Sequence, residues 1–62
     1  MARNLRRLRA ERGFTQEEVA EQAGLNRNYV GMIEREENAP TVDTLEKIAQ
    51  VLQVDPAALF EP

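Results

Sequence analysis

Cysteine and histidine are both absent from the 62 residues of this chain. Their absence excludes a disulfide framework, thiolate or imidazole ligands for zinc, and Cys-His or Ser-His nucleophilic catalysis. No phosphate-cradling glycine loop is visible, and so short a chain has little room for a substrate cleft. We therefore expect no metal, no cofactor, no small-molecule ligand and no enzymatic activity. A chain without cysteine is compatible with a cytoplasmic location, which is our expectation.

Long apolar runs are missing as well. No stretch approaches the roughly 20 apolar residues that a membrane-spanning helix needs, and no apolar signal-peptide segment follows the N-terminal arginines. Hydrophobic residues nevertheless make up 42% of the chain and are evenly spaced, as is typical of globular proteins. We expect residues 1–62 to form one small domain without a membrane partner, near the lower size limit for folding alone.

Positive charge is scarce overall but is gathered at one end of the chain. The formal net charge is −3, although residues 1–13 carry five arginines and only one glutamate. If this N-terminal segment, Arg27 and Arg35 face the same way, a local positive surface can exist on an acidic molecule. Non-specific attraction to nucleic acid should still be weaker than that of a basic domain.

Residues 15–34 carry the most informative pattern, which predicts two short helices joined by a sharp turn. Thr15 and Glu18 have the spacing of a capping box, which begins the first helix. Gly24 stands where the chain must leave that helix with positive φ, and Asn26 is a suitable N-cap for the second helix. Apolar residues at helical spacing form the inner faces: Val19, Ala20, Ala23, Val30 and Ile33. This arrangement is a helix-turn-helix.

The remaining segments predict three more helices, so the expected fold is all-α with five helices. The first helix should run over residues 2–12 and stop at Gly13. A loop over residues 35–40 ends at Pro40, Thr41 caps the fourth helix, and Asp55-Pro56 begins a short last helix over residues 57–60. Expected core residues outside the helix-turn-helix are Ala2, Leu5, Leu8, Phe14, Val42, Leu45, Ile48, Ala49 and Leu52.

The chain resembles the phage Cro and repressor family, also called the xenobiotic-response-element family of bacterial regulators. The positions that carry this resemblance are Arg9 through Gln16, Ala20, Gly24, Ile33-Glu34-Arg35, Pro40-Thr41 and the run from Asp43 to Ala49. A match spread over so many positions is far more specific than a single short motif. The resemblance implies a compact lambda-repressor-like fold and an internal ion pair between Arg9 and Glu34.

The resemblance further implies a transcriptional regulator of bacterial or phage type that binds double-stranded DNA sequence-specifically. The second helix of the helix-turn-helix would enter the major groove. Candidate base-contacting residues are Asn26, Arg27, Asn28 and Met32, since an arginine fork matches guanine and an asparagine amide matches adenine. Candidate DNA-backbone contacts are Thr15, Gln16, Tyr29, Gly31, Arg35 and Asn38. The alternatives are a purely capping role for Asn26 and ordinary solvated positions for Arg27 and Asn28.

Two departures from the family pattern point to a second hypothesis. Gly31 replaces the polar residue that relatives commonly have on the groove face, and Glu36 stands where they usually have a glycine. The net acidity of the chain and Gly31 support the alternative to DNA binding, which is a protein-interaction module that kept the fold and lost DNA contact. Relatives commonly pair as dimers on DNA half-sites, so a weak homodimer is also expected. Candidate residues for its interface are Val51, Val54, Leu59 and Phe60, although packing within the monomer explains most of them at least as well.

Overall fold

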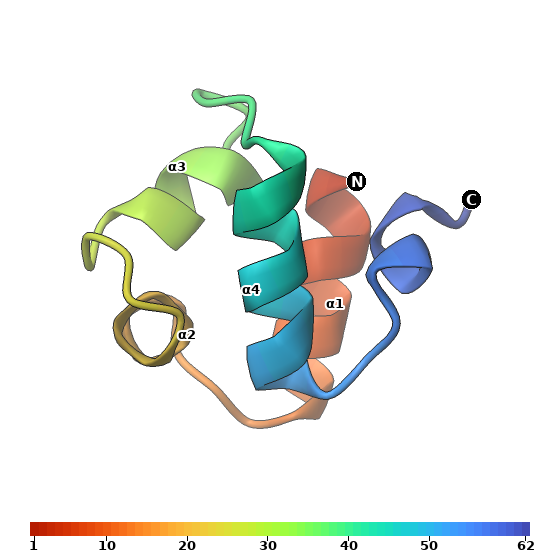
Figure 1. Cartoon of the computed structure of the whole chain (residues 1–62), viewed down its shortest axis with the longest axis horizontal. Helices are drawn as coiled ribbons and strands as arrows, with labels where there is room; N and C mark the ends of the chain where they lie inside the picture. Colours follow the sequence, from red (N-terminus) through yellow and green to blue (C-terminus); the bar gives the residue numbers. More distant parts are fainter.

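The computed structural model describes residues 1–62, and its regular secondary structure consists of helices without any strand. In chain order these are α1 (Ala2–Glu11), α2 (Gln16–Gln22), α3 (Tyr29–Glu34), α4 (Val42–Leu52) and a 3₁₀ helix, η1 (Pro56–Phe60). Figure 1 shows α2 and α3 on one side of α4 and η1 on the other. The whole chain measures 26 × 22 × 19 Å. None of the helices is both long and apolar enough to span a bilayer.

The predicted fifth α-helix is wrong, because the chain forms four α-helices and η1 has 3₁₀ geometry. Its start signal is correct: the Asp55 side chain accepts a hydrogen bond from the Ala57 N–H at 2.8 Å, and Pro56 follows the cap. Ala58 N–H then donates to the Asp55 carbonyl at 2.8 Å, the i to i+3 spacing of a 3₁₀ turn. The backbone is extended again at Glu61, so the segment is too short to settle into α-helical spacing.

The predicted caps of α2 and α4 are confirmed. The Thr15 hydroxyl accepts from the Glu18 N–H at 3.0 Å, and the Glu18 carboxylate accepts from the Thr15 N–H at 2.7 Å. This is the complete capping box. Thr41 accepts from the Thr44 N–H at 3.2 Å. Gly24 has φ of +74°, which explains why a residue without a β-carbon ends α2.

The prediction that Asn26 is the N-cap of α3 is wrong. The α-helix begins three residues later, at Tyr29, with Asn28 as its N-cap. Asn26 instead closes a tight turn: its side-chain oxygen accepts from the Asn28 N–H, and its carbonyl accepts from the Tyr29 N–H, both at 2.9 Å. Arg27 and Asn28 therefore lie in a turn that leads into α3.

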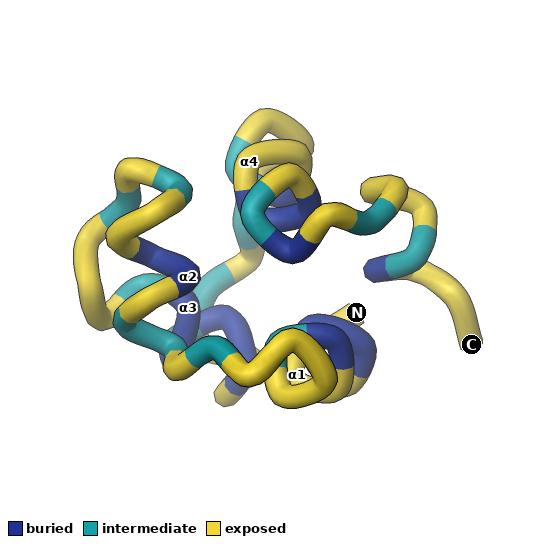
Figure 2. Tube along the Cα trace, turned by 90° about the horizontal axis from the view of Figure 1, so that it is seen from below, coloured by how far each residue is buried: buried dark blue, intermediate teal, exposed yellow.

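Eleven buried apolar residues from all five helices form the core. Figure 2 shows the buried parts of α1, α4 and η1 facing one another across the interior. Val42 was expected in this core but is 69% exposed. Its position is in the first turn of α4, whereas α2 packs beside the opposite end of that helix (Figure 1). The prediction of a core role for Val42 is therefore wrong.

A buried asparagine ties the two ends of the chain together. The Asn4 side-chain amide donates to the Leu59 carbonyl at 3.1 Å and also to the Glu61 carbonyl. Leu59 itself is fully buried, so it belongs to the core and cannot form part of an exposed dimer patch. The expected interface role of Leu59 is wrong for that reason.

Candidate nucleic-acid interface

One buried carboxylate joins α1, α2 and α3. The Glu34 side chain, at the end of α3, is 2% exposed. It accepts from Arg9 Nε at 2.6 Å and Arg9 Nη2 at 3.1 Å, the two parallel bonds of a bidentate ion pair. Gln16 Nε2, at the start of α2, donates to the same carboxylate at 2.9 Å. Arg9 also donates to the Phe14 carbonyl at 2.9 Å, so it supports the chain between α1 and α2.

The environment of Glu34 keeps its carboxylate ionised. Burial alone would raise the pKa of Glu34, but hydrogen bonds from Arg9 and Gln16 and the charges of Arg9 and Arg6 together lower it below its ordinary value. The hydrogen bond to Glu34 in turn raises the pKa of Arg9. The helix-turn-helix geometry therefore depends on a fully charged internal pair at neutral pH.

Arg6 has a role that the sequence reasoning missed. Its Nη2 donates to the Glu34 backbone carbonyl at 2.8 Å, and its Nε lies 3.7 Å from the Glu34 carboxylate. Carbonyls at the end of a helix lack intrahelical donors, so Arg6 supplies one to α3 from a neighbouring helix. The i, i+3 spacing of Arg6 and Arg9 on α1 was the signal available for this assignment.

The candidate base-contacting residues lie at and near the leading end of α3. Asn26, Arg27 and Asn28 are exposed in the turn before the helix, whereas Met32 is half-buried one turn later. The Asn26 oxygen is used by the turn, which leaves its NH₂ group available as a donor. Arg27 has no carboxylate within ion-pair distance, so its guanidinium can meet an acceptor without breaking an existing contact.

Three of the candidate backbone-contacting residues converge over α3. Gly31 is buried, and a β-carbon at that position would lie 2.9 Å from Gln16 Oε1 and 3.0 Å from Arg35 Nη1. Gln16 is held by Glu34 beneath it. Arg35 forms a bidentate ion pair with Glu37, at 3.0 and 3.2 Å, in which both side chains are 54% exposed.

Tyr29, the first residue of α3, contacts Asn38 in the loop that follows this helix. The Tyr29 hydroxyl donates to Asn38 Oδ1 at 3.0 Å, and the Tyr29 ring packs against the core. Both side chains are half-buried, so this bond joins the start of α3 to the loop. Thr15 remains exposed at the start of α2, but its hydroxyl is used by the capping box.

The comparisons with known proteins agree with this geometry. A family model described as Helix-turn-helix matches residues 5–59. The chain belongs to this helix-turn-helix family. It is 44% identical over 59 residues to the uncharacterized HTH-type transcriptional regulator y4dJ of Sinorhizobium fredii, covering 95% of this chain and 77% of the relative.

A second relative shows that the helix-turn-helix domain also occurs within longer proteins. The HTH-type transcriptional regulator SutR of Escherichia coli is 39% identical over 62 residues, which cover all of this chain and 35% of SutR. The solved N-terminal DNA binding domain of SinR from Bacillus subtilis superimposes with a TM-score of 0.88 at 32% identity. That match covers 98% of this chain and 90% of the SinR domain.

Half of the cationic side chains of the helix-turn-helix domain are already paired. Of its eight, those in ion pairs are Arg6, Arg7, Arg9 and Arg35, and the remaining four are Arg3, Arg12, Arg27 and Lys47. Internal pairing thus reduces the number of cations free to attract phosphate. Of these four, Arg27 is the one in the turn that leads into α3.

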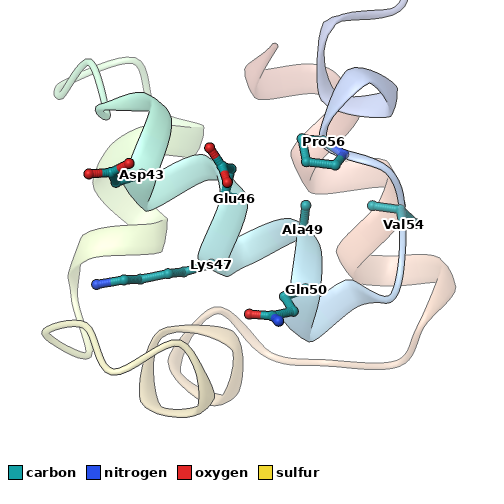
Figure 3. A pocket seen from close by; sticks show the side chains of 7 residues that line it. All are labelled: Asp43, Glu46, Lys47, Ala49, Gln50, Val54 and Pro56. Carbon is teal, nitrogen blue, oxygen red and sulfur yellow. The ribbon is translucent and has the colours of Figure 1, made fainter.

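The largest surface pocket of the helix-turn-helix domain is a poor place for an anion. It has a volume of about 480 Å³ and lies along α4 and the segment leading into η1. Figure 3 shows Asp43, Glu46 and Lys47 spread along α4 without a common point toward which their polar ends converge. No group of acidic residues in the structure is arranged to hold a metal ion. The residues around the start of α3 are therefore the better candidate site.

Proposed function

We propose that this chain is the sequence-specific DNA-binding domain of a bacterial or phage-type transcriptional regulator. The observation that carries the proposal is the exposed, unpaired Arg27 beside Asn28 at the leading end of α3. In a helix-turn-helix, residues at this end contact base edges in the major groove. Similarity to the SinR DNA binding domain and to HTH-type transcriptional regulators supports the same function.

Base readout depends on a small number of side chains. The Arg27 fork donates to guanine O6 and N7, and the Asn28 amide pairs with adenine N6 and N7. Asn26 donates its free NH₂ group, and Met32 offers an apolar contact to a thymine methyl group. Each good bidentate pair contributes about 1–3 kcal/mol of discrimination against the wrong base.

Phosphate contacts flank this reading end. Gln16 and Thr15 lie at the start of α2, where exposed backbone N–H groups also favour an anion. Arg35, Tyr29 and Asn38 hold phosphates from the other side of α3. Relatively few free cations take part, so the affinity for DNA falls less steeply with salt than that of a basic relative.

A homodimer on DNA is the second part of the proposal. Two copies on paired half-sites would place their α3 helices about 34 Å apart, which is one duplex turn. Phe60 is 61% exposed and Val51 and Val54 are half-buried, so only a small apolar area is available for pairing. The dimer is therefore weak and assembles on the DNA.

Selection from a library of random duplexes, followed by titration of the recovered sequence, tests the function. We expect a preferred sequence, and we expect Arg27→Ala to lower affinity for it by about 1–3 kcal/mol and to relax preference at one base pair. Lys47→Ala is the matched control, because it removes an equally unpaired charge on α4. No complex with any duplex at low salt, or an unchanged affinity and preference in Arg27→Ala, would show instead a protein-interaction module.

A further inference from the structure

Two side chains from other positions of the chain cover Gly31. Gln16 reaches over it from the start of α2, and Arg35 reaches back over it from the end of α3. A β-carbon built on Gly31 would lie 2.9 Å from Gln16 Oε1, 3.4 Å from Gln16 Cδ and 3.0 Å from Arg35 Nη1. The 2.9 Å distance is shorter than real contacts of a β-carbon and the 3.0 Å distance is tighter than most of them, so both side chains would have to shift for a larger residue.

Each of these two side chains is restrained by a bond to a carboxylate. The Gln16 amide donates to the buried Glu34 carboxylate at 2.9 Å, and Glu34 is itself held by Arg9. Arg35 is held by Glu37. The atoms that a β-carbon would displace are the far ends of Gln16 and Arg35, which can move without disturbing the core.

We propose that Gly31 is a positioning residue for DNA binding, because its missing side chain lets Gln16 and Arg35 lie flat across α3. This inference rests on the proposed function, in which these two side chains contact phosphates. Alanine at position 31 pushes the Gln16 carboxamide away from Glu34 and turns the Arg35 guanidinium outward. The phosphate contacts then lose their geometry, while base preference, which Arg27 and Asn28 determine, stays the same.

Gly31→Ala separates binding from folding. We expect a melting temperature close to that of the wild type, because the higher helix propensity of alanine offsets the weakened hydrogen bond between Gln16 and Glu34. Affinity for the selected duplex and for random-sequence duplexes should fall by the same factor, about tenfold for one charged hydrogen bond lost. Gln50→Ala, at an exposed position on α4, should leave both quantities unchanged. A melting temperature below that of Gln16→Ala, which lacks the same hydrogen bond to Glu34, would overturn the inference, since the core would then be disturbed as well.

A mutant cycle tests whether the effect passes through the two side chains. In a protein that already carries Gln16→Ala and Arg35→Ala, nothing lies over position 31 to be displaced. Gly31→Ala should then cause no further loss of affinity. An undiminished tenfold loss in that background would mean that the β-carbon meets DNA directly, and the inference would be wrong.

The free protein offers a readout that does not need DNA. In nuclear magnetic resonance spectra, the Gln16 side-chain NH₂ signals should shift and exchange faster with water in Gly31→Ala, because the bond to Glu34 is weakened. Unchanged signals would overturn the inference. If wild-type protein binds duplexes and Gly31→Ala binds them equally well, only this inference fails. If wild-type protein binds no duplex, the proposed function fails with it.

Discussion

Replacing Glu34 by glutamine should nearly unfold this protein. The change keeps the size and shape of the side chain but removes its charge from a site that is 2% exposed. Arg9, whose side chain is 17% exposed, then keeps its positive charge without a carboxylate partner. A glutamine oxygen in the place of Oε1 can still accept from Arg9 Nη2 and Gln16 Nε2, but the glutamine NH₂ group then faces Arg9 Nε, so the Arg9 Nε bond is lost.

The size of the effect follows from the burial of the pair. Removing one partner of a buried ion pair costs about 3–5 kcal/mol, mostly because the other charge is stranded. Arg9 retains its bond to the Phe14 carbonyl and some contact with water, which places Glu34→Gln near the lower end, at about 3 kcal/mol. A core of this size rarely supplies more than about 3–5 kcal/mol. Folded and unfolded molecules should therefore coexist at room temperature.

Urea unfolding followed by circular dichroism measures this loss. The matched control is the double variant Arg9→Met, Glu34→Leu, which removes both charges and should recover most of the stability, because an apolar pair of similar volume avoids the stranded charge. A loss below about 1 kcal/mol in Glu34→Gln would refute the argument, because that is the cost expected of a solvent-exposed pair.

Three further predictions concern carboxylates of this structure. Glu37→Gln should raise affinity for all duplexes severalfold by removing a negative charge beside the expected path of the phosphates, whereas Glu46→Gln on α4 should not; equal or weaker binding in titrations would contradict this. Glu36 has φ of +61°, a backbone conformation that is strained for a residue with a β-carbon but not for glycine. Glu36→Gly should therefore stabilise the fold by about 0.5–1 kcal/mol, and a lower melting temperature would contradict this prediction. Since the pKa of Glu34 is lowered in the fold, its stabilising contribution is present above the ordinary glutamate pKa and is lost as pH falls through the lowered value. Acid titration of unfolding should show this loss in wild type, with a shallower fall in Glu34→Gln.

Much of the fold could be predicted because its signals are local. The capping box of Thr15, the cap at Thr41 and the turn at Gly24 each depend on atoms only a few residues apart. The repeating apolar positions also predict which face of each helix turns inward. Val42 shows where such reasoning ends: its spacing matches the core, yet its side chain is 69% exposed, while Leu45 in the same turn is buried.

The candidate site was less predictable, because its residues depend on contacts between helices. The sequence placed Arg27 and Asn28 in a helix, but the turn formed by Asn26 keeps both of them ahead of α3. Asn4 has no local pattern that reveals its bond to the far end of the chain. The sequence predicted that Gly31 is an open position on the helix face that would approach DNA, whereas the Gln16 and Arg35 side chains cover it.

The sequence alone determined the helix-turn-helix, the capping box that begins α2 and the charged pair that its resemblance implies, since short-range hydrogen bonds and apolar spacing depend on neighbours along the chain. Only the tertiary structure decided that Glu34 is shared among Arg9, Arg6 and Gln16, and which cations remain unpaired. The physical reason is that hydrogen bonding and burial of a side chain depend on whichever helix packs against it, and that partner can lie anywhere in the sequence.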